Sequence, residues 1–252
     1  MTATSLTIAT WNILGRQNHR TRSTAAPGEV EAVLREHPVD VLCLQEVHFY
    51  DRSADEQLLR ELAAAGLPHF VGLPLSDSHL DDDARLGVGV ASRLPLRRHD
   101  TFVLTNPGIR ASVRGREWIL HDKGMVGCTL DAPDGQRLLV YSLHLFPYFE
   151  FGVAEDDVRV DQMWSEFWDY ADRRGEELEL VLAGDFNHRT REHAAARWSR
   201  RKWQFCLPDE GTTVSGLPLD DFALSWSPAH KEHRSVPTFS DHHLVVVRLQ
   251  FD

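Results

Sequence analysis

Cysteine is scarce in this chain of 252 residues. Cys43, Cys128 and Cys206 are odd in number, lie far apart and form no CxxC pair. This spacing predicts neither a disulfide framework nor a zinc knuckle. Cys43 and Cys128 lie within apolar runs, where a thiol usually packs as a small core residue. The cysteines therefore predict a core role and no redox or metal chemistry.

Long apolar segments are also missing. No run approaches the ~20 residues of a membrane-spanning helix. The first twelve residues lack the basic start and the apolar stretch of a signal peptide. We therefore expect a soluble, cytoplasmic protein without a transmembrane segment, and nothing in the sequence identifies a protein partner.

Basic residues are outnumbered by acidic ones. Lys and Arg total 27 against 38 Asp and Glu, which gives a net charge of −11. This balance argues against a surface that is basic all over, as a general nucleic-acid coat would be, but it permits a local basic groove. The chain is 42% hydrophobic, enough for a substantial core. Because we find no linker and no break in composition, we expect a single domain over residues 1–252.

Apolar runs bounded by turn residues predict a mixture of strands and helices. Strands are expected at 6–11, 39–47, 86–92, 138–145, 180–183 and 243–251, with a further short strand after Leu219. Helices are expected after Pro27, after a Ser53–Glu56 capping box, and over residues 153–174. Pro133-Asp134-Gly135 predicts a hairpin. The mixture indicates two β-sheets packed face to face with helices outside.

Unusual polar residues lie at the ends of these apolar runs. They are Asn12, Glu46, His144, Asp185, Asn187, Asp220, Asp241 and His242. Strand ends gather at the rim of a sandwich, so these side chains can share one site. Buried carboxylates need partners or a cation, and oxygen ligands favour magnesium over zinc. The alternative for Asp185 and Asn187 is an Asx-turn that closes a strand.

Several motifs in order resemble the endonuclease/exonuclease/phosphatase superfamily, which has the DNase I-like fold. They are TWN at Asn12, LQEV at Glu46, GVGVASR, SLHL at His144, GDFN at Asp185, LDDF at Asp220 and SDHH at Asp241. The resemblance runs from about residue 6 to residue 251. It implies an α/β fold, a four-layer α/β/β/α sandwich with two mixed β-sheets packed face to face. It also implies the hydrolysis of a phosphoester.

The resemblance further implies a cofactor, Mg²⁺ or Mn²⁺. The ion would bind at Glu46 with help from Asn12 and Asp241. Two departures matter for the branch of the family. Abasic-site endonucleases carry an acid where this chain has Leu14, and a tyrosine where it has His144. The sequence is therefore closer to the DNase and sphingomyelinase branches.

By the same resemblance, the catalytic residues have distinct roles. His242, oriented by Asp220, would act as general base or stabilise the pentacovalent phosphorane. Asp185 would orient the attacking water, and Asn187 would bind a non-bridging phosphate oxygen. His144 would contact the phosphate or protonate the leaving oxygen.

The substrate is left open between nucleic acid and smaller phosphoesters. Residues 189–203 hold six Lys or Arg and one acid, and we predict that Arg200, Arg201 and Lys202 bind substrate phosphates, with nearby tryptophans stacking bases. The alternative is an amphipathic helix with solvated arginines and core tryptophans. We predict a nuclease acting on DNA or RNA. The alternatives are a phosphoesterase for a lipid, an inositol phosphate or a nucleotide-like molecule, and a non-catalytic binding module.

Three smaller features accompany these predictions. An aromatic segment at 146–151 follows His144 and is predicted to stack a base, meet a lipid or pack in the core. Lys123-Gly124 resembles the sphingomyelinase and phosphatase branches. His230 and His233 have loose metal-ligand spacing, but we place them on a surface loop.

Overall fold

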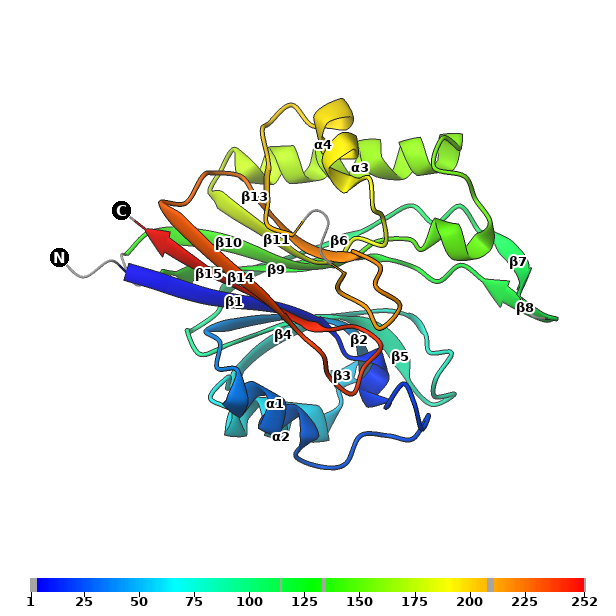
Figure 1. The fold of residues 1–252 in the computed structure, drawn as a ribbon, viewed down its shortest axis with the longest axis horizontal. Helices are drawn as coiled ribbons and strands as arrows, with labels where there is room; N and C mark the ends of the chain where they lie inside the picture. Colours follow the sequence, from blue (N-terminus) through cyan, green and yellow to red (C-terminus); the bar gives the residue numbers. More distant parts are fainter. Residues whose placement is uncertain (1–3, 114, 133–134, 208–210, 252) are drawn as a thin grey trace.

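The computed structural model describes residues 4–113, 115–132, 135–207 and 211–251. Two mixed β-sheets pack face to face, and helices cover their outer faces (Figure 1). The termini lie side by side at one end of the molecule (Figure 1). The layers confirm the α/β/β/α sandwich expected from the sequence.

The first sheet has seven strands in the order β14-β15-β1-β2-β5-β4, with β3 paired to β2. β1 and β2 run parallel, and the remaining neighbours pair antiparallel. The strands are β1 (Thr4–Asn12), β2 (Val41–Tyr50), β3 (Ser53–Ala54), β4 (His69–Asp77), β5 (Arg85–Ser92), β14 (His230–Val236) and β15 (Leu244–Phe251).

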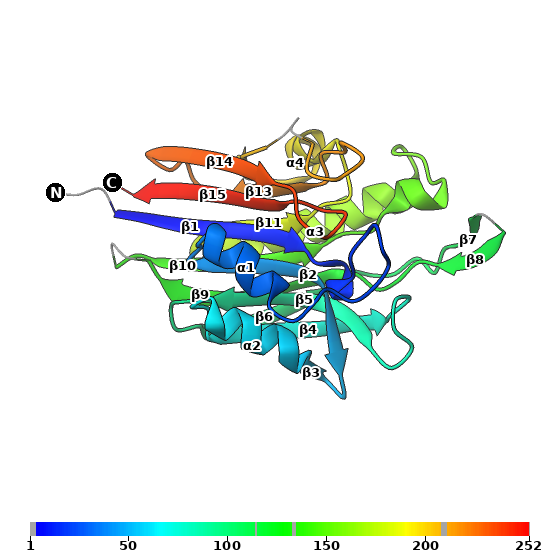
Figure 2. The ribbon, with the colours of Figure 1, turned by 60° about the horizontal axis from the view of Figure 1, so that its bottom comes forward.

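The second sheet has six strands in the order β12-β13-β11-β10-β9-β6. Here β10 and β11 form the parallel pair. The strands are β6 (Arg97–Val103), β9 (Gly124–Asp131), β10 (Arg137–His144), β11 (Glu179–Asp185), β12 (Gln204–Phe205) and β13 (Asp220–Leu224). A separate two-stranded arm, β7 (Arg110–Val113) and β8 (Arg116–Ile119), projects beyond the sandwich (Figures 1 and 2).

Helices cover the outside of each sheet. α1 (Glu29–Glu36) and α2 (Glu56–Ala64) lie on the first sheet, and α3 (Val158–Gly175) and α4 (Arg191–Trp198) on the second (Figure 2). Two short 3₁₀ turns, η1 (Leu14–Arg16) and η2 (Tyr148–Phe151), follow β1 and β10. In the described part of the chain, no helix has the length and apolarity needed to cross a bilayer.

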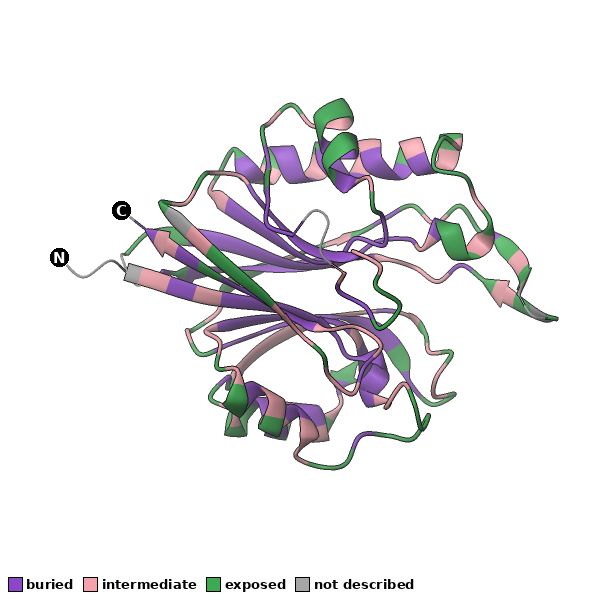
Figure 3. Ribbon diagram, viewed as in Figure 1, coloured by how far each residue is buried: buried purple, intermediate pink, exposed green. Residues whose placement is uncertain are grey.

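Helical periodicity explains why α3 covers its sheet. Val160, Trp164, Phe167, Trp168 and Ala171 recur at helical spacing and are all buried against the second sheet. The opposite face of the helix is solvated (Figure 3). These aromatics are therefore core residues, as their spacing predicts.

Two local predictions are wrong, and a third concerns residues outside the described ranges. The expected Ser53–Glu56 capping box is wrong, because Ser53 belongs to β3 and Asp55 caps α2, its side chain accepting from the backbone amides of residues 57 and 58. Asp is an equally good N-cap and lies directly before the helix. The segment of His230 and His233 is the edge strand β14 and not a loop. The predicted hairpin residues Pro133 and Asp134 lie outside the described residues.

A polar connection joins the two sheets inside the apolar core. The side chain of Gln45 accepts from Thr10 Oγ1 at 3.2 Å and donates to Ser142 Oγ at 3.0 Å. Ser142 Oγ in turn donates to the carbonyl of Leu44 at 2.8 Å. These buried hydrogen bonds link β1 and β2 of the first sheet to β10 of the second, close to the strand ends.

A fully buried ion pair holds the second sheet to its helical cover. Arg191, at the start of α4, contacts Asp221 of β13 at 2.8 Å, and both side chains are 0% exposed. Arg191 also donates to the carbonyls of Pro218 and Leu207, at 2.6 and 2.7 Å. The other carboxylate oxygen of Asp221 accepts three backbone amides. One basic residue of the predicted substrate segment is thus structural.

We expect Asp221→Asn to lower the free energy of unfolding by about 3–5 kcal/mol, because it leaves the Arg191 charge buried without its counterion. Urea unfolding measures the loss. The control is Glu117→Gln, which removes the partner of Arg110 in an exposed pair and should cost less than about 1 kcal/mol. Equal effects of the two substitutions would contradict this assignment.

Candidate active site

The predicted polar residues meet at one rim of the sandwich because both parallel strand pairs end there. Asn12 ends β1 and is in register with Gln45, where the parallel pairing of β1 with β2 stops partway along β2. His144 is in register with Asp185 at the ends of β10 and β11, and Asp185 pairs with Asp220 at the start of β13. The structure therefore brings together side chains from both sheets.

Two of these residues adopt left-handed backbone conformations. Glu46 has φ +53° at a bulge where the pairing of β2 with β5 shifts register. Asn187 has φ +54° just after β11. Asn tolerates this region better than most residues, but Glu does not. Backbone strain of this kind gathers at functional sites, and bulges re-aim a side chain at the edge of a strand.

Asn12 connects the two sheets at this rim. Its amide nitrogen donates to Glu46 Oε1 at 3.2 Å and to Asp185 Oδ2 at 3.3 Å. Its amide oxygen accepts from the backbone of Leu14 at 3.1 Å. Asn12 therefore positions one carboxylate from each sheet. Leu14, where related abasic-site enzymes have an acid, contributes its backbone amide instead.

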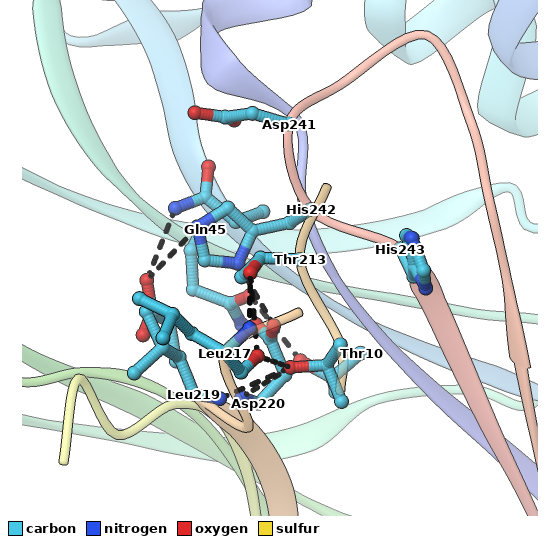
Figure 4. A network of polar contacts seen from close by, with 12 residues as sticks. Thr10, Gln45, Thr213, Leu217, Leu219, Asp220, Asp241, His242 and His243 are labelled. Carbon is cyan, nitrogen blue, oxygen red and sulfur yellow. Dashed lines mark hydrogen bonds and ion pairs between the residues drawn. The ribbon is translucent and has the colours of Figure 1, made fainter. Parts of the chain in front are cut away.

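His242 and Asp220 form a buried hydrogen-bonded pair (Figure 4). His242 Nδ1 contacts Asp220 Oδ2 at 2.8 Å. Thr212 supports the pair because its hydroxyl accepts from the backbone amides of Leu219 and Asp220. Burial tends to lower the pKa of His242, but the carboxylates of Asp220 and Asp185 outweigh it and hold the pKa well above its usual value. The contact fixes the ring so that Nε2 faces the rim.

Asp185 lies between the two histidines. Its Oδ2 is 3.5 Å from His144 Nε2 and 3.7 Å from His242 Nε2. Burial raises the pKa of Asp185 to about 7, with Asp220 adding to the rise and His242 opposing it. Its other oxygen accepts from the backbone amide of Asn187 at 2.9 Å. The Asx-turn considered from the sequence is thus present within the same cluster.

Lys123 is a site residue to which the sequence interpretation gave no role. Its ammonium lies 2.8 Å from His144 Nε2 and 3.2 Å from Nδ1. Burial, followed by the charge of Lys123, holds the pKa of His144 well below its usual value, so the imidazole is neutral at pH 7. Burial also lowers the pKa of Lys123, although Glu46 and Asp185 oppose that shift. The Lys-Gly dipeptide before β9 was the available signal.

Glu46 lines a small polar recess. The other polar residues of its lining are Ser76, His79, His121, Asp122, Lys123 and His144. Burial tends to raise the pKa of Glu46, but Lys123, His79 and the hydrogen bond from Asn12 bring it below its usual value. The rings of His79 and His121 lie 5.4 Å apart. Neither histidine was predicted, because both lie on loops outside the recognised motifs.

The oxygen-rich donors at this rim fit a hard divalent cation. Glu46 Oε2 is buried and has no hydrogen-bond partner among the described residues, so no neighbouring donor offsets the charge on this oxygen. Asp241, whose Oδ1 accepts from Ser240 at 3.3 Å, lies nearby and is less buried. Atoms of Asp185, Asp220 and His242 also lie within 4.8 Å of one another. Of these, Asp220 and His242 are already paired to each other.

Asn187 is held at the edge of the cluster. Its side-chain nitrogen donates to the carbonyl of Leu145 at 2.9 Å. This bond uses one of the two amide hydrogens, and the other stays available to a phosphate oxygen. The binding of a phosphate oxygen by Asn187 stays a prediction.

Arg200, Arg201 and Lys202 do not join this rim. Arg200 lies 3.7 Å from both Asp169 and Asp172 near the C-terminal end of α3. Gly175, the last residue of α3, lies against Arg201. α3 leads into the start of β11, whereas the predicted catalytic residues Asp185 and Asn187 lie at or after the end of β11. Arg200 and Arg201 therefore lie toward the opposite end of the second sheet, and the prediction that residues 200–202 form a basic groove at the candidate active site finds no support in this geometry.

The aromatic residues of the two candidate segments are mostly buried. Trp203 packs on Trp168 with ring centroids 5.2 Å apart, while Arg197 lies over the ring of Trp198. In the segment after His144, Tyr148 is buried and Phe149 is 46% exposed. The helix alternative for residues 189–203 describes this packing better than a base-stacking surface does.

His188 gives the protein a measurable acid sensitivity. Burial lowers the pKa of His188 to about 4, below the ~6.5 of an unfolded histidine. The unfolded state therefore binds more protons between these values, and the contribution to stability is complete above pH 6.5 and lost as the pH falls toward 4. We expect about 2 kcal/mol of the free energy of unfolding to disappear between pH 7 and pH 5 through this residue.

The measurement is urea unfolding at pH 7 and pH 5 for the wild type and for His188→Gln. Between pH 7 and pH 5, the free energy of unfolding of the variant should fall by about 2 kcal/mol less than that of the wild type. This difference does not depend on how stable the variant is at pH 7. A variant with an unchanged difference between the two pH values would contradict the buried neutral histidine.

Comparisons with known proteins agree with the fold. Residues 9–244 match the model of the Endonuclease/Exonuclease/phosphatase family, which confirms the resemblance found in the sequence. No curated protein sequence matches the chain.

Solved structures share the architecture at low sequence identity. An endonuclease/exonuclease/phosphatase from Beutenbergia cavernae is 20% identical with a TM-score of 0.71, and the match covers 98% of this chain and 72% of that one. The catalytic domain of human nocturnin is 18% identical with a TM-score of 0.67, covering 99% and 94%. Sphingomyelinase C from Streptomyces griseocarneus is 14% identical with a TM-score of 0.65, covering 98% and 99%.

Proposed function

Because the chain belongs to the endonuclease/exonuclease/phosphatase family, whose members are hydrolytic phosphoesterases, we propose that it is a Mg²⁺- or Mn²⁺-dependent phosphodiesterase. One observation carries this proposal. Two histidines, His144 and His242, converge on the same oxygen of Asp185 beside the unpaired carboxylate oxygen of Glu46. A tetrahedral phosphoryl group can bind at a site that offers hydrogen-bond donors, one acceptor and an oxygen for a cation close together.

The residues divide the chemistry between them. Asp185 orients the attacking water. His242, held by Asp220 through Nδ1, acts as general base or stabilises the charge of the phosphorane through Nε2. Asn187 donates its second amide hydrogen to a non-bridging oxygen. His144, with Lys123 against its ring, contacts the phosphate. Protonation of the leaving oxygen, the other role expected from the sequence, does not suit this imidazole because its lowered pKa keeps it neutral.

Glu46, Asp241 and Asn12 would hold the cation. Glu46 supplies the unpaired oxygen, and Asn12 keeps that carboxylate in place. When bound, the divalent ion offsets the charge that develops on the phosphate. Lys123 and His79 lower the pKa of Glu46, so this carboxylate stays ionised and ready to bind a cation.

The substrate class is the second part of the proposal. The sequence favoured a nuclease, chiefly through Arg200, Arg201 and Lys202. Since Arg200 and Arg201 contact α3 near its far end, we infer a small phosphodiester as the preferred substrate, and the nuclease stays a second candidate. The fold shared with a sphingomyelinase supports a lipid phosphodiester as a further candidate to test.

Removal of divalent cations with EDTA should abolish hydrolysis of a chromogenic phosphodiester, and Mg²⁺ or Mn²⁺ should restore it. Glu46→Gln should raise the metal concentration needed for half-maximal rate at least tenfold, because it removes the charge of the unpaired oxygen. Rates measured over a metal titration test this. Wild-type metal dependence in Glu46→Gln would remove Glu46 from the cation site.

His242→Ala should lower kcat by about 10²–10⁴-fold, the range for a positioned proton-transfer group. Asp220→Asn should produce part of that loss, because Asn no longer fixes the tautomer and charge of the ring. Circular dichroism should show both variants folded. If the double variant of His242→Ala and Asp220→Asn lowers kcat by the product of the two single effects, the two residues act independently. That result would contradict the proposal.

Neutralising Arg200, Arg201 and Lys202 together tests the nuclease. On a small phosphodiester, the rate should stay within twofold. If these residues track a polymer, the slope of log K against log salt for duplex DNA should fall by about one unit for each phosphate that the variant no longer neutralises. We expect no change in that slope, and a clear fall would restore the nuclease to first place.

A further inference from the structure

We propose that a pocket beside Asn187 binds a nucleobase-like heteroaromatic ring on the part of the substrate that stays attached to the phosphate. The inference rests on the proposed phosphodiesterase and names the substrate class of the same site. The pocket has a volume of about 190 Å³. Its lining combines flat aromatic surface, aliphatic walls and a few polar groups, and each part argues for this occupant.

The pocket shares its walls with the catalytic cluster. Asn187 lines it directly. Leu219, also in the lining, precedes Asp220, and its carbonyl accepts from the backbone amide of Phe186 at 2.9 Å. A phosphate held by Asn187 therefore places one of its substituents at the mouth of this pocket. The recess at Glu46 has a different lining and shares no residue with this pocket.

The aromatic wall is preformed. Tyr148 and Phe149 come from η2 and both line the pocket. The hydroxyl of Tyr148 donates to the carbonyl of Arg159 at the start of α3, at 3.3 Å, which fixes the ring. Phe149 leaves 46% of its surface exposed. An exposed phenyl group beside a catalytic amide offers a stacking surface for a planar ring.

His188 adds an unsatisfied hydrogen-bond acceptor to the lining. Its Nε2 is buried and has no partner among the described residues. The other ring nitrogen is engaged with the backbone carbonyl of Phe146, so Nδ1 carries the proton and Nε2 is left as an acceptor. The ring is held edge-on against Trp164, with centroids 5.0 Å apart. A bound group with an N–H or O–H donor would satisfy this nitrogen.

Charged groups at the same pocket complete the pattern. Glu155 offers an acceptor and Arg189 a donor, and both are exposed members of the lining. An acyl chain could not form a hydrogen bond with either group or with the unpaired Nε2 of His188. A second phosphate would meet the carboxylate of Glu155. The edge of a nucleobase carries donors and acceptors together, and its faces stack on aromatic rings.

The test compares two esters with the same p-nitrophenolate leaving group in the presence of Mg²⁺. One carries thymidine through its 5′ oxygen on the phosphate, and the other carries methyl. We expect kcat/KM to be at least tenfold higher for the thymidine ester. Phe149→Ala should lower that ratio about 5- to 100-fold by removing one stacking surface. The matched control is Ile119→Ala on the projecting arm, also 46% exposed, which should leave the ratio unchanged.

A binding measurement separates the pocket from the chemistry. In calorimetric titrations with thymidine 5′-monophosphate, methyl phosphate and octyl phosphate, the nucleotide should bind most tightly. Phe149→Ala should weaken the binding of the nucleotide and leave the binding of the other two ligands unchanged. His188→Phe keeps an aromatic ring but lacks the acceptor nitrogen, so it should also weaken nucleotide binding.

The outcomes are distinguishable. Equal rates for both esters, a ratio unchanged in Phe149→Ala, or tightest binding of octyl phosphate would overturn the pocket assignment while leaving the phosphodiesterase intact. Failure to hydrolyse either ester, with nucleotide binding that still depends on Phe149, would overturn the proposed function and leave the pocket standing.

Discussion

The amide group of Asn12 makes the contacts on which the candidate active site depends. It donates to a carboxylate from each sheet, Glu46 on one side and Asp185 on the other. These two acids share no strand and no sheet, so their separation is set by how the sheets pack. The hydrogen bonds of Gln45 between the sheets hold the same alignment one layer deeper. A slip of one sheet over the other would therefore separate the two carboxylates.

Much of the fold and the site could be predicted from the sequence. Strands buried on both faces read as continuous apolar runs, so a polar residue that ends such a run, such as His144 or Asp185, is conspicuous. The family motifs then placed Asp220 and His242 in one cluster, and the structure has them in contact. Local pattern was sufficient here because each residue sits at the end of a regular element.

Other features depended on tertiary contacts that local pattern does not carry. Arg191 lies in a basic segment, yet it is buried against Asp221 from a distant strand. Lys123 directly precedes β9, and its ammonium contacts His144 only because β9 pairs with β10. The left-handed backbone of Glu46 arises from a shift in pairing with β5. In each case the deciding partner is far away in the sequence.

The pairing of β1 with β15 sets the order in which the active site can be completed. These strands join residue 4 to residue 251 and lie beside each other through the first sheet. Until residues 244–251 have been synthesised, β1 has an unpaired edge, and the segment of Asp241 and His242 has no strand to anchor it. The rim therefore depends on a contact between segments more than 230 residues apart, because β1 carries Asn12 at its end and β15 directly follows His242 and His243.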